Sequence, residues 1–213
     1  MREKLVKDRT RIGVQIKSFI NLSGISNKNS ERRVCKKFIQ DILNVEDTSE
    51  IIFYLQTMAK RWISTDEEIS QVEKKLLLQA NLQPDLERIY RSAPGIGAKT
   101  SRILINELGD MSQFKNERSL FSFTGLTPQE YSSGEHIRQG HISRQGRAIL
   151  RKILVQAAWA AVRKDSELKR VFEKISARAG KKRAIVAIAR RLIGHLRACL
   201  RKKEEYSYKG DQT

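Results

Sequence analysis

Apolar side chains recur at three- and four-residue spacing along most of this chain, and Gly, Pro and polar turns interrupt the spacing. Residues three and four apart lie on the same face of an α-helix, so this period is that of amphipathic helices. We find no sustained alternation of the kind that a β-strand shows, and no internal repeat. The sequence therefore predicts an all-α protein.

The first 83 residues are predicted to form a region of amphipathic helices. Residues 2–22 give one helix, and Ser30 and Thr48 are expected to cap two more. Thr65 and Glu68 have the spacing of a capping box. These segments could form a helical hairpin or a coiled-coil arm, and too few clean heptads are present to distinguish the two.

Residues 84–203 are predicted to form a second domain around a helix-hairpin-helix pattern. A helix from Pro84 leads into the turn PGIG at residues 94–97, and a second helix ends near Gly109. The glycines permit a tight turn and leave backbone N–H groups free to approach a phosphate. The candidate nucleic-acid contacts here are Gly95, Gly97, Lys99 and Arg102.

The charge of the chain is concentrated after residue 137. The whole sequence has a formal net charge of +18, and residues 138–203 hold 20 basic and only 3 acidic side chains. Such an excess favours a polyanionic partner, because binding to phosphates releases condensed counterions. The sequence therefore predicts binding to DNA.

A loop with no helical or strand period lies just before this basic region and contains Ser132, Ser133 and Gly134. A serine hydroxyl attacks a phosphodiester only if its proton can leave and the charge at phosphorus is stabilised. Arginine suits the second task because its planar fork binds two phosphate oxygens. The candidate arginines are Arg138, Arg144, Arg147 and Arg151. Ser133 is the candidate nucleophile, with Ser132 as the alternative.

The remaining composition sets broad limits. Cys35 and Cys199 lack CxxC spacing and indicate buried free thiols in a cytoplasmic protein. The three histidines do not form a zinc pattern with them, so no metal site is predicted. No apolar run has the length needed to span a membrane. Residues 204–213 are expected to form a disordered tail.

Residues 94–159 resemble the C-terminal transposase domain of the Piv-like DNA invertases and the IS110-type insertion-sequence transposases. The matching motifs occur in order: PGIG, ELGD with Phe114, FTGLTP, YSSG, ISRQG, LR and AAW. Residues 2–25 also resemble the helix that follows the catalytic N-terminal domain of that family.

The resemblance implies that Ser133, or Ser132, attacks DNA and forms a phosphoserine link. The family also carries a RuvC-like domain whose acidic DEDD set binds a divalent metal. This sequence begins with the helix after that domain, so we expect the acidic domain to be absent and the chain to be inactive alone. Mg²⁺ is then expected only with the acidic domain, and no cofactor in this chain. The implied partners are DNA, a structured guide RNA, and further copies of the full-length protein.

Two alternatives stay open. PGIGAKTS also resembles the hairpin of helix-hairpin-helix DNA glycosylases, in which a lysine at the position of Lys99 can form a Schiff base. We rank this lower, since no VDTH-like segment follows and two cysteines cannot hold a four-cysteine iron cluster. The second alternative is a nucleic-acid-binding module with no enzymatic activity.

Overall fold

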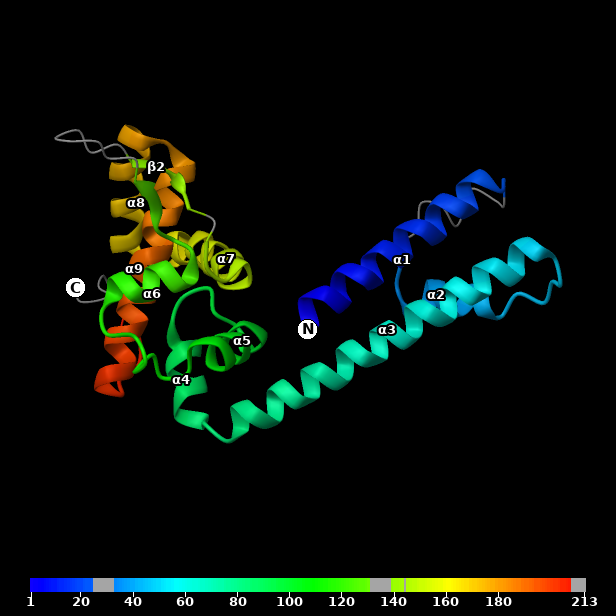
Figure 1. Ribbon diagram of the computed structural model, residues 1–213, viewed down its shortest axis with the longest axis horizontal. Helices are drawn as coiled ribbons and strands as arrows, with labels where there is room; N and C mark the ends of the chain where they lie inside the picture. Colours follow the sequence, from blue (N-terminus) through cyan, green and yellow to red (C-terminus); the bar gives the residue numbers. More distant parts are fainter. Residues whose placement is uncertain (25–32, 131–138, 144, 208–213) are drawn as a thin grey trace. The chain divides into compact units, whose positions relative to one another are not determined.

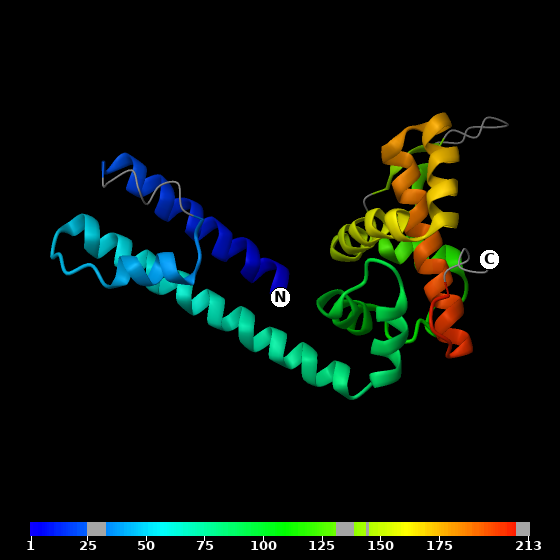
Figure 2. The ribbon, with the colours of Figure 1, turned by 180° about the vertical axis from the view of Figure 1, so that it is seen from behind.

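The computed structural model describes residues 1–24, 33–130, 139–143 and 145–207. The chain divides into two compact units, Met1–Lys75 and Leu76–Thr213, and each has its own hydrophobic core (Figures 1 and 2). In the described residues the regular structure consists of helices and one short pair of strands. The prediction of an all-α protein is confirmed, with the strand pair as a local addition. The predicted domain boundaries at residues 83 and 203 stay predictions.

The first unit contains α1 (Arg2–Leu22), α2 (Lys36–Leu43) and most of α3 (Glu50–Asn81). Both views show α1 running alongside α3 (Figures 1 and 2). The side chains that close the core between these helices are apolar. They include Ile16, Ile39, Leu55, Ala59 and Trp62. Burial of this apolar stripe is the main reason that the helices pack together.

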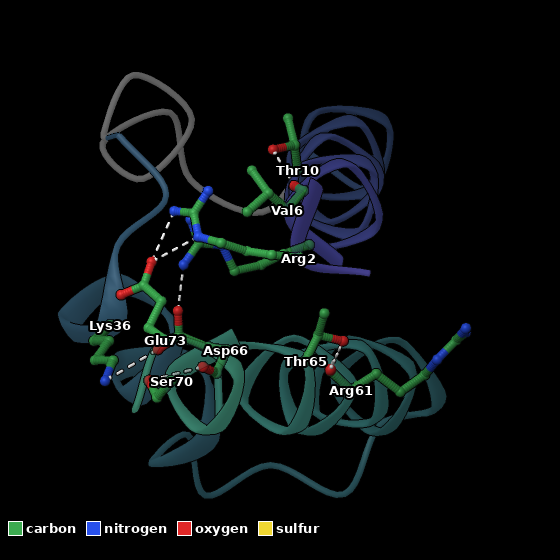
Figure 3. A network of polar contacts seen from close by, with 10 residues as sticks. Arg2, Val6, Thr10, Lys36, Arg61, Thr65, Asp66, Ser70 and Glu73 are labelled. Atoms are coloured by element: carbon green, nitrogen blue, oxygen red, sulfur yellow. Dashed lines mark hydrogen bonds and ion pairs between the residues drawn. The ribbon is translucent and has the colours of Figure 1, made fainter. Parts of the chain in front are cut away.

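Three ion pairs fix the register of the first unit (Figure 3). Arg2 donates from Nε and Nη2 to Oε1 of Glu73, at 2.9 and 2.7 Å. Further along α1, Arg9 pairs with Asp66, which also accepts Nζ of Lys36 at 3.0 Å. The residue numbers of these pairs rise along α1 and fall along α3, so the two helices are antiparallel.

Two helix starts differ from the sequence expectation in this unit. Helix α3 continues through Thr65, whose hydroxyl donates to the carbonyl of Arg61 at 2.8 Å instead of capping a new helix. This hydrogen bond is an ordinary one for threonine inside a helix. The helix begins one residue after Ser49, whose Oγ accepts from the N–H of Ile52 at 3.4 Å, so Thr48 is not the cap.

Helix α2 begins later than predicted. Its N-cap is Cys35, and residues 33–35 are not helical. Ser30, the predicted cap, lies outside the described residues. Cys35 is exposed rather than buried, because it stands at this helix start, and Cys199 is half-buried. Both are free thiols.

The second unit contains six helices of the described chain and the strand pair. Its elements are α4 (Pro84–Ser92), α5 (Ala98–Leu108), α6 (Glu117–Thr124), β1 (Pro128–Glu130), β2 (Gln139–Ile142), α7 (Ala148–Lys164), α8 (Ser166–Ala179) and α9 (Lys181–Lys202). Gly109, Gly125 and Gly180 end helices as the sequence predicts. Helix α7 packs against α5, α6, α8 and α9, so it is the central element of this unit.

Small residues on α7 let its neighbours approach closely. Ala158 and Ala161 are fully inaccessible, and Ala157 is 1% exposed. The partners across the core are larger, with Leu104, Ile188 and Leu192 also fully buried. Large side chains against small ones give the interdigitation that close packing needs.

The predicted disordered tail is wrong for residues 204–207, which the structure describes. Tyr206 is 7% exposed, and its hydroxyl donates to Oδ2 of Asp165 at 2.9 Å. Its backbone N–H donates to Oγ of Ser92 at 2.8 Å. These contacts anchor the segment, whereas residues 208–213 lie outside the described part. No described helix has both the length and the apolarity to cross a membrane.

Candidate nucleic-acid interface

The loop that carries the two candidate serines is bounded by the strand pair. Strand β1 pairs antiparallel with β2, with Pro128 opposite Ile142 and Glu130 opposite Gln139. The N–H of Ser143 adds a hydrogen bond to the carbonyl of Thr127 at 2.9 Å. We call residues 128–142 the serine hairpin. Ser132, Ser133 and Arg138 lie in residues 131–138, which join its strands and are outside the described residues, as is Arg144.

Two glycines fix the base of the serine hairpin. Gly146 has φ +84°, and a Cβ there would lie 2.6 Å from the carbonyl oxygen of Phe123 and 2.7 Å from that of Ser122. Gly125 has φ +68°, and its Cβ would lie 2.3 Å from the carbonyl oxygen of Gln145. Only glycine allows backbones to approach this closely. The base of the hairpin is thereby held on the end of α6 and the start of α7.

The two described arginines of the predicted cluster occupy different environments. Arg147 is the N-cap of α7, its side chain is 60% exposed, and its Nε lies 3.4 Å from Oε2 of Glu107. Arg151, one turn later, is half-buried. Its Nη1 is enclosed beside Gly125 and has no hydrogen-bond partner among the described residues. Arg147 can therefore reach a phosphate directly, while Arg151 supports the turn at Gly125.

The PGIG turn between α4 and α5 is packed on one side and open on the other. Gly95 has φ +80°, and a Cβ would lie 2.5 Å from the carbonyl oxygen of Ala157 in α7. Ile96 is 5% exposed, so it too belongs to the core. Gly97 is the N-cap of α5, and a Cβ there would meet no atom within 4 Å. The start of α5 is thus open to solvent.

Lys99 and Arg102 differ in how exposed their side chains are. Lys99 is exposed in the first turn of α5, where the helix dipole favours an anion. Arg102 is 23% exposed, and its Nε lies 3.4 Å from Oε1 of Glu87 in α4. Of the four predicted contacts at this turn, Gly95, Gly97 and Lys99 are exposed, and Gly95 also lies against Ala157. Arg102 pairs with Glu87.

Comparison with known proteins identifies the family of this arrangement. Residues 87–173 match the family described as Transposase IS116/IS110/IS902 family. Residues 87–173 therefore carry a domain of the IS110-type transposases. They include α5, the serine hairpin and α7, and they end in α8.

Several curated proteins are similar to this chain. The transposase for insertion sequence element IS1111A of Coxiella burnetii is 29% identical and covers 97% of this chain and 58% of its own length. The transposase for IS1328 of Yersinia enterocolitica is 29% identical, covering 74% of this chain and 47% of its own length. The pilin gene-inverting protein of Moraxella bovis is 28% identical, with 72% and 48% covered. The chain spans about half the length of the curated relatives that it matches.

The match makes residues 87–173 a transposase-type domain. The described residues contain no group of three His, Cys, Asp or Glu side chains able to hold a metal ion. The described surface offers this domain cationic side chains and backbone N–H groups.

One basic cluster of the second unit was not predicted from the sequence. Helix α9 begins at Lys181, three residues earlier than its apolar stripe indicates, with Gly180 as its N-cap. Its first turn thereby brings Lys181 and Lys182 beside Lys152 of α7, where all three line a common groove. Gly180 followed by three basic residues was the available signal, since a glycine can stand at a helix N-cap.

Proposed function

We propose that this chain is the DNA-binding, serine-bearing part of a site-specific DNA recombinase. Ser133 is the proposed nucleophile, with Ser132 as the alternative. The observation that supports this most is the fixed base of the serine hairpin, where Gly125 and Gly146 join it to α6 and α7. A rigid base limits where residues 131–138 can be presented, and preorganisation of this kind is what a reacting group needs.

In the proposed reaction the Ser133 oxygen forms a bond to phosphorus as a DNA oxygen leaves. The serine proton goes to a base, and the broken strand is held as a phosphoserine ester that a second DNA hydroxyl can attack. Arg147 is exposed next to the hairpin base and can neutralise charge on the phosphate. Arg138 and Arg144 are proposed for the same role from their sequence positions. Because the chain spans about half of its relatives' length, the complete reaction is assigned to a longer protein.

The steps that we assign to this chain involve its serine and its arginines and no bound metal. We propose that the acidic carboxylates for Mg²⁺ come from another domain. A structured guide RNA and self-association of the whole protein are further proposals that follow from the family resemblance. Co-purification of RNA tests the first proposal, and the mass of the intact assembly tests the second.

For DNA binding we propose two contact points. The open start of α5, with Gly97 and Lys99, can hold one backbone phosphate, because the helix N-terminus favours an anion and Lys99 is exposed in its first turn. Arg147 gives the second. This arrangement contacts the DNA backbone and does not read its sequence. No described contact favours the glycosylase alternative, and the PGIG turn falls inside the transposase match.

The serine is tested in a protein that joins this chain to its acidic domain. Ser133→Ala should leave DNA affinity within about twofold and reduce strand exchange at least about 10³-fold, because the nucleophile is removed. Ser143→Ala serves as the matched control, since this serine lies just after β2 and outside the proposed chemistry. The measurements are a binding titration and the yield of recombined product.

The covalent intermediate gives an independent readout. A nicked DNA substrate should leave a serine-linked adduct that mass spectrometry assigns to Ser133. An adduct on Ser132 would move the role to its neighbour. Full recombination in the Ser132→Ala/Ser133→Ala double variant would remove the hairpin serines from the mechanism.

A further inference from the structure

An apolar groove lies on the second unit between α7 and the first half of α9. Its volume is about 700 Å³, which is within the range of about 300–1,000 Å³ typical of small-molecule sites. The apolar side chains that line it come from β2, α7 and α9. They are Ile142, Ala148, Val155, Trp159, Ile185 and Val186. We call this the Trp159 groove.

The most unusual member of the groove is Trp159. Its side chain is 40% exposed, although large aromatic residues contribute most of their energy when buried. The ring packs edge-on against Phe172 of α8 with 5.5 Å between ring centroids, so its position is fixed. A fixed, half-exposed indole is a ready surface on which a flat aromatic group can stack.

The charged residues of the groove are all basic. Arg151 and Lys152 contribute from α7, and Lys181 and Lys182 from the first turn of α9. No Asp or Glu is among the described residues that line it. An apolar floor with an exclusively cationic border is complementary to a ligand that has an aromatic centre and anionic flanks. A nucleotide strand has both.

A protein occupant fits these residues poorly. The cores of protein interfaces are depleted in lysine, and here three lysines line one small groove. A DNA duplex also fits poorly, because its bases are stacked inside the double helix. Its surface presents only phosphates and the edges of the bases in the grooves. Single-stranded nucleic acid is instead bound by aromatic side chains that stack on bases, inside a basic surface that follows the backbone.

The groove is next to the serine hairpin, since Ile142 belongs to β2 and also lines the groove. We propose that the Trp159 groove binds an unstacked base of a DNA strand, with Lys152, Lys181 and Lys182 on the flanking phosphates. This inference rests on the proposed function and refines it: the groove would hold a strand that has left the duplex, near the point where the serine hairpin meets its phosphate.

The test uses the intrinsic fluorescence of the chain. Trp159 and Trp62 are its two tryptophans, and Trp62 is 5% exposed in the first unit. Oligothymidylate of about 15 nucleotides should quench the emission of the wild-type chain, while a duplex of equal length should quench it much less. The quenching should disappear in Trp159→Phe, in which only Trp62 emits. Quenching that persists in that variant, or that duplex produces equally, would overturn the proposal.

Affinity gives the second measurement. Trp159→Leu should weaken binding of the oligothymidylate about tenfold and change duplex binding less than about twofold, because leucine offers no ring on which a base can stack. Trp159→Phe should stay within about threefold of the wild type, since a smaller ring still stacks. Equal affinities for all three proteins would exclude the groove as the site. A ribo-oligonucleotide that binds more than about tenfold tighter than the DNA strand would also contradict the assignment to DNA.

The lysines are tested by salt dependence. Lys181→Gln/Lys182→Gln should reduce the slope of log affinity against log salt by about 1.4, because each single-strand phosphate that a lysine neutralises contributes about 0.7 to that slope. The matched control is Lys174→Gln on α8, an exposed lysine that does not line the groove. These readouts do not involve serine chemistry. Absence of the Ser133 adduct with intact quenching would reject the proposed function alone, and the reverse result would reject only the groove.

Discussion

Asp66 shows how one side chain can organise a whole helical unit. Its side chain is 9% exposed, and it accepts from Arg9 of α1 and Lys36 near the start of α2. Burial by itself raises the pKa of this carboxyl, but the hydrogen bonds and charges of Lys36 and Arg9 outweigh it, so the pKa of Asp66 is lowered overall. The folded unit therefore favours the ionised form, and one carboxylate holds three helices.

The first prediction concerns the free energy of unfolding of this unit. Asp66→Asn should reduce it by about 1–3 kcal/mol at pH 7, because two cations lose a charged hydrogen-bond acceptor. A group with a lowered folded pKa stabilises above its unfolded pKa, and that stability is lost as the pH falls through the folded pKa. Wild-type stability should therefore decline below about pH 4, while the variant should lack this part of the decline.

The measurement is urea unfolding followed by Trp62 fluorescence in a Trp159→Phe background, repeated from pH 7 to pH 3. The matched control is Glu67→Gln, the exposed neighbour of Asp66, which should stay within about 0.5 kcal/mol of the parent. If both substitutions had the same effect, the pairing with Arg9 and Lys36 would not be the cause.

At the scale of elements, the serine hairpin depends on backbone contacts at its base more than on the length of its strands. The strands have only three and four residues, which is short for a stable pair alone. The N–H of Arg147 donates to the carbonyl of Phe123 at 2.9 Å, beside the close approach of Gly146 to the same carbonyl. The end of α6 therefore acts as the support for the hairpin.

Gly146→Ala should loosen this support. The added Cβ would meet a backbone oxygen 2.6 Å away at a position with φ +84°, so neither a side-chain movement nor an ordinary backbone conformation relieves it. Hydrogen exchange at the N–H groups of Ser143 and Arg147 should become at least about tenfold faster, equivalent to about 1.4 kcal/mol of local stability. Recombination by the longer protein should fall with it.

The control is Gly180→Ala, which also places a side chain at positive φ, +80°, but where a Cβ meets no atom within 4 Å. It should destabilise the junction of α8 and α9 and leave protection at Ser143 and Arg147 unchanged. Equal exchange in both variants would mean that backbone conformation, and not contact with α6, decides the result.

Helix type and several helix ends could be predicted from the sequence because their causes are local. Gly109, Gly125 and Gly180 end helices, and these ends could be predicted because each glycine stands at the edge of a segment with a clear helical period of apolar residues. The continuity of α3 through Thr65 could not be predicted, since a threonine with a glutamate three residues later fits both a helix start and a helix interior. Three-dimensional packing decided between them.

The candidate site was predictable only in part. The roles of Gly97, Lys99 and Arg147 stay predictions, and all three residues are exposed. The packing of Gly95 on Ala157 and the pairing of Arg102 with Glu87 depend on partners in other helices. The Trp159 groove joins residues of β2, α7 and α9. Periodicity assigns Trp159 to a helix and does not show which neighbour leaves it uncovered.

At the scale of the whole second unit, Tyr206 joins parts of the chain that are far apart in sequence. Its hydroxyl reaches Asp165, which is 3% exposed and also caps α8 by accepting the N–H of Leu168 at 3.0 Å. Its N–H reaches Ser92 at the end of α4. Burial, followed by the hydrogen bond to Asp165, raises the pKa of Tyr206. The neutral phenol is therefore the form that the folded unit holds.

Tyr206→Phe should lower the stability of the second unit by about 1–3 kcal/mol, because the buried Asp165 loses a donor. The sign of the pH effect is opposite to that of Asp66: a raised pKa stabilises below the unfolded value near 10, and that stability is lost as the pH rises above it. Thermal unfolding at pH 7 and pH 10.5 measures both. A variant as stable as the parent at pH 7 would show that the hydroxyl is not needed.

The contacts of Tyr206 also set an order of events during synthesis. Ser92 lies 114 residues before its hydrogen-bond partner, so at about 5–20 residues per second it is translated on the order of ten seconds earlier. The first unit has all of its partners within the first 75 residues and can form in that interval. The core of the second unit therefore gains its contacts with Tyr206 after its other parts have been synthesised.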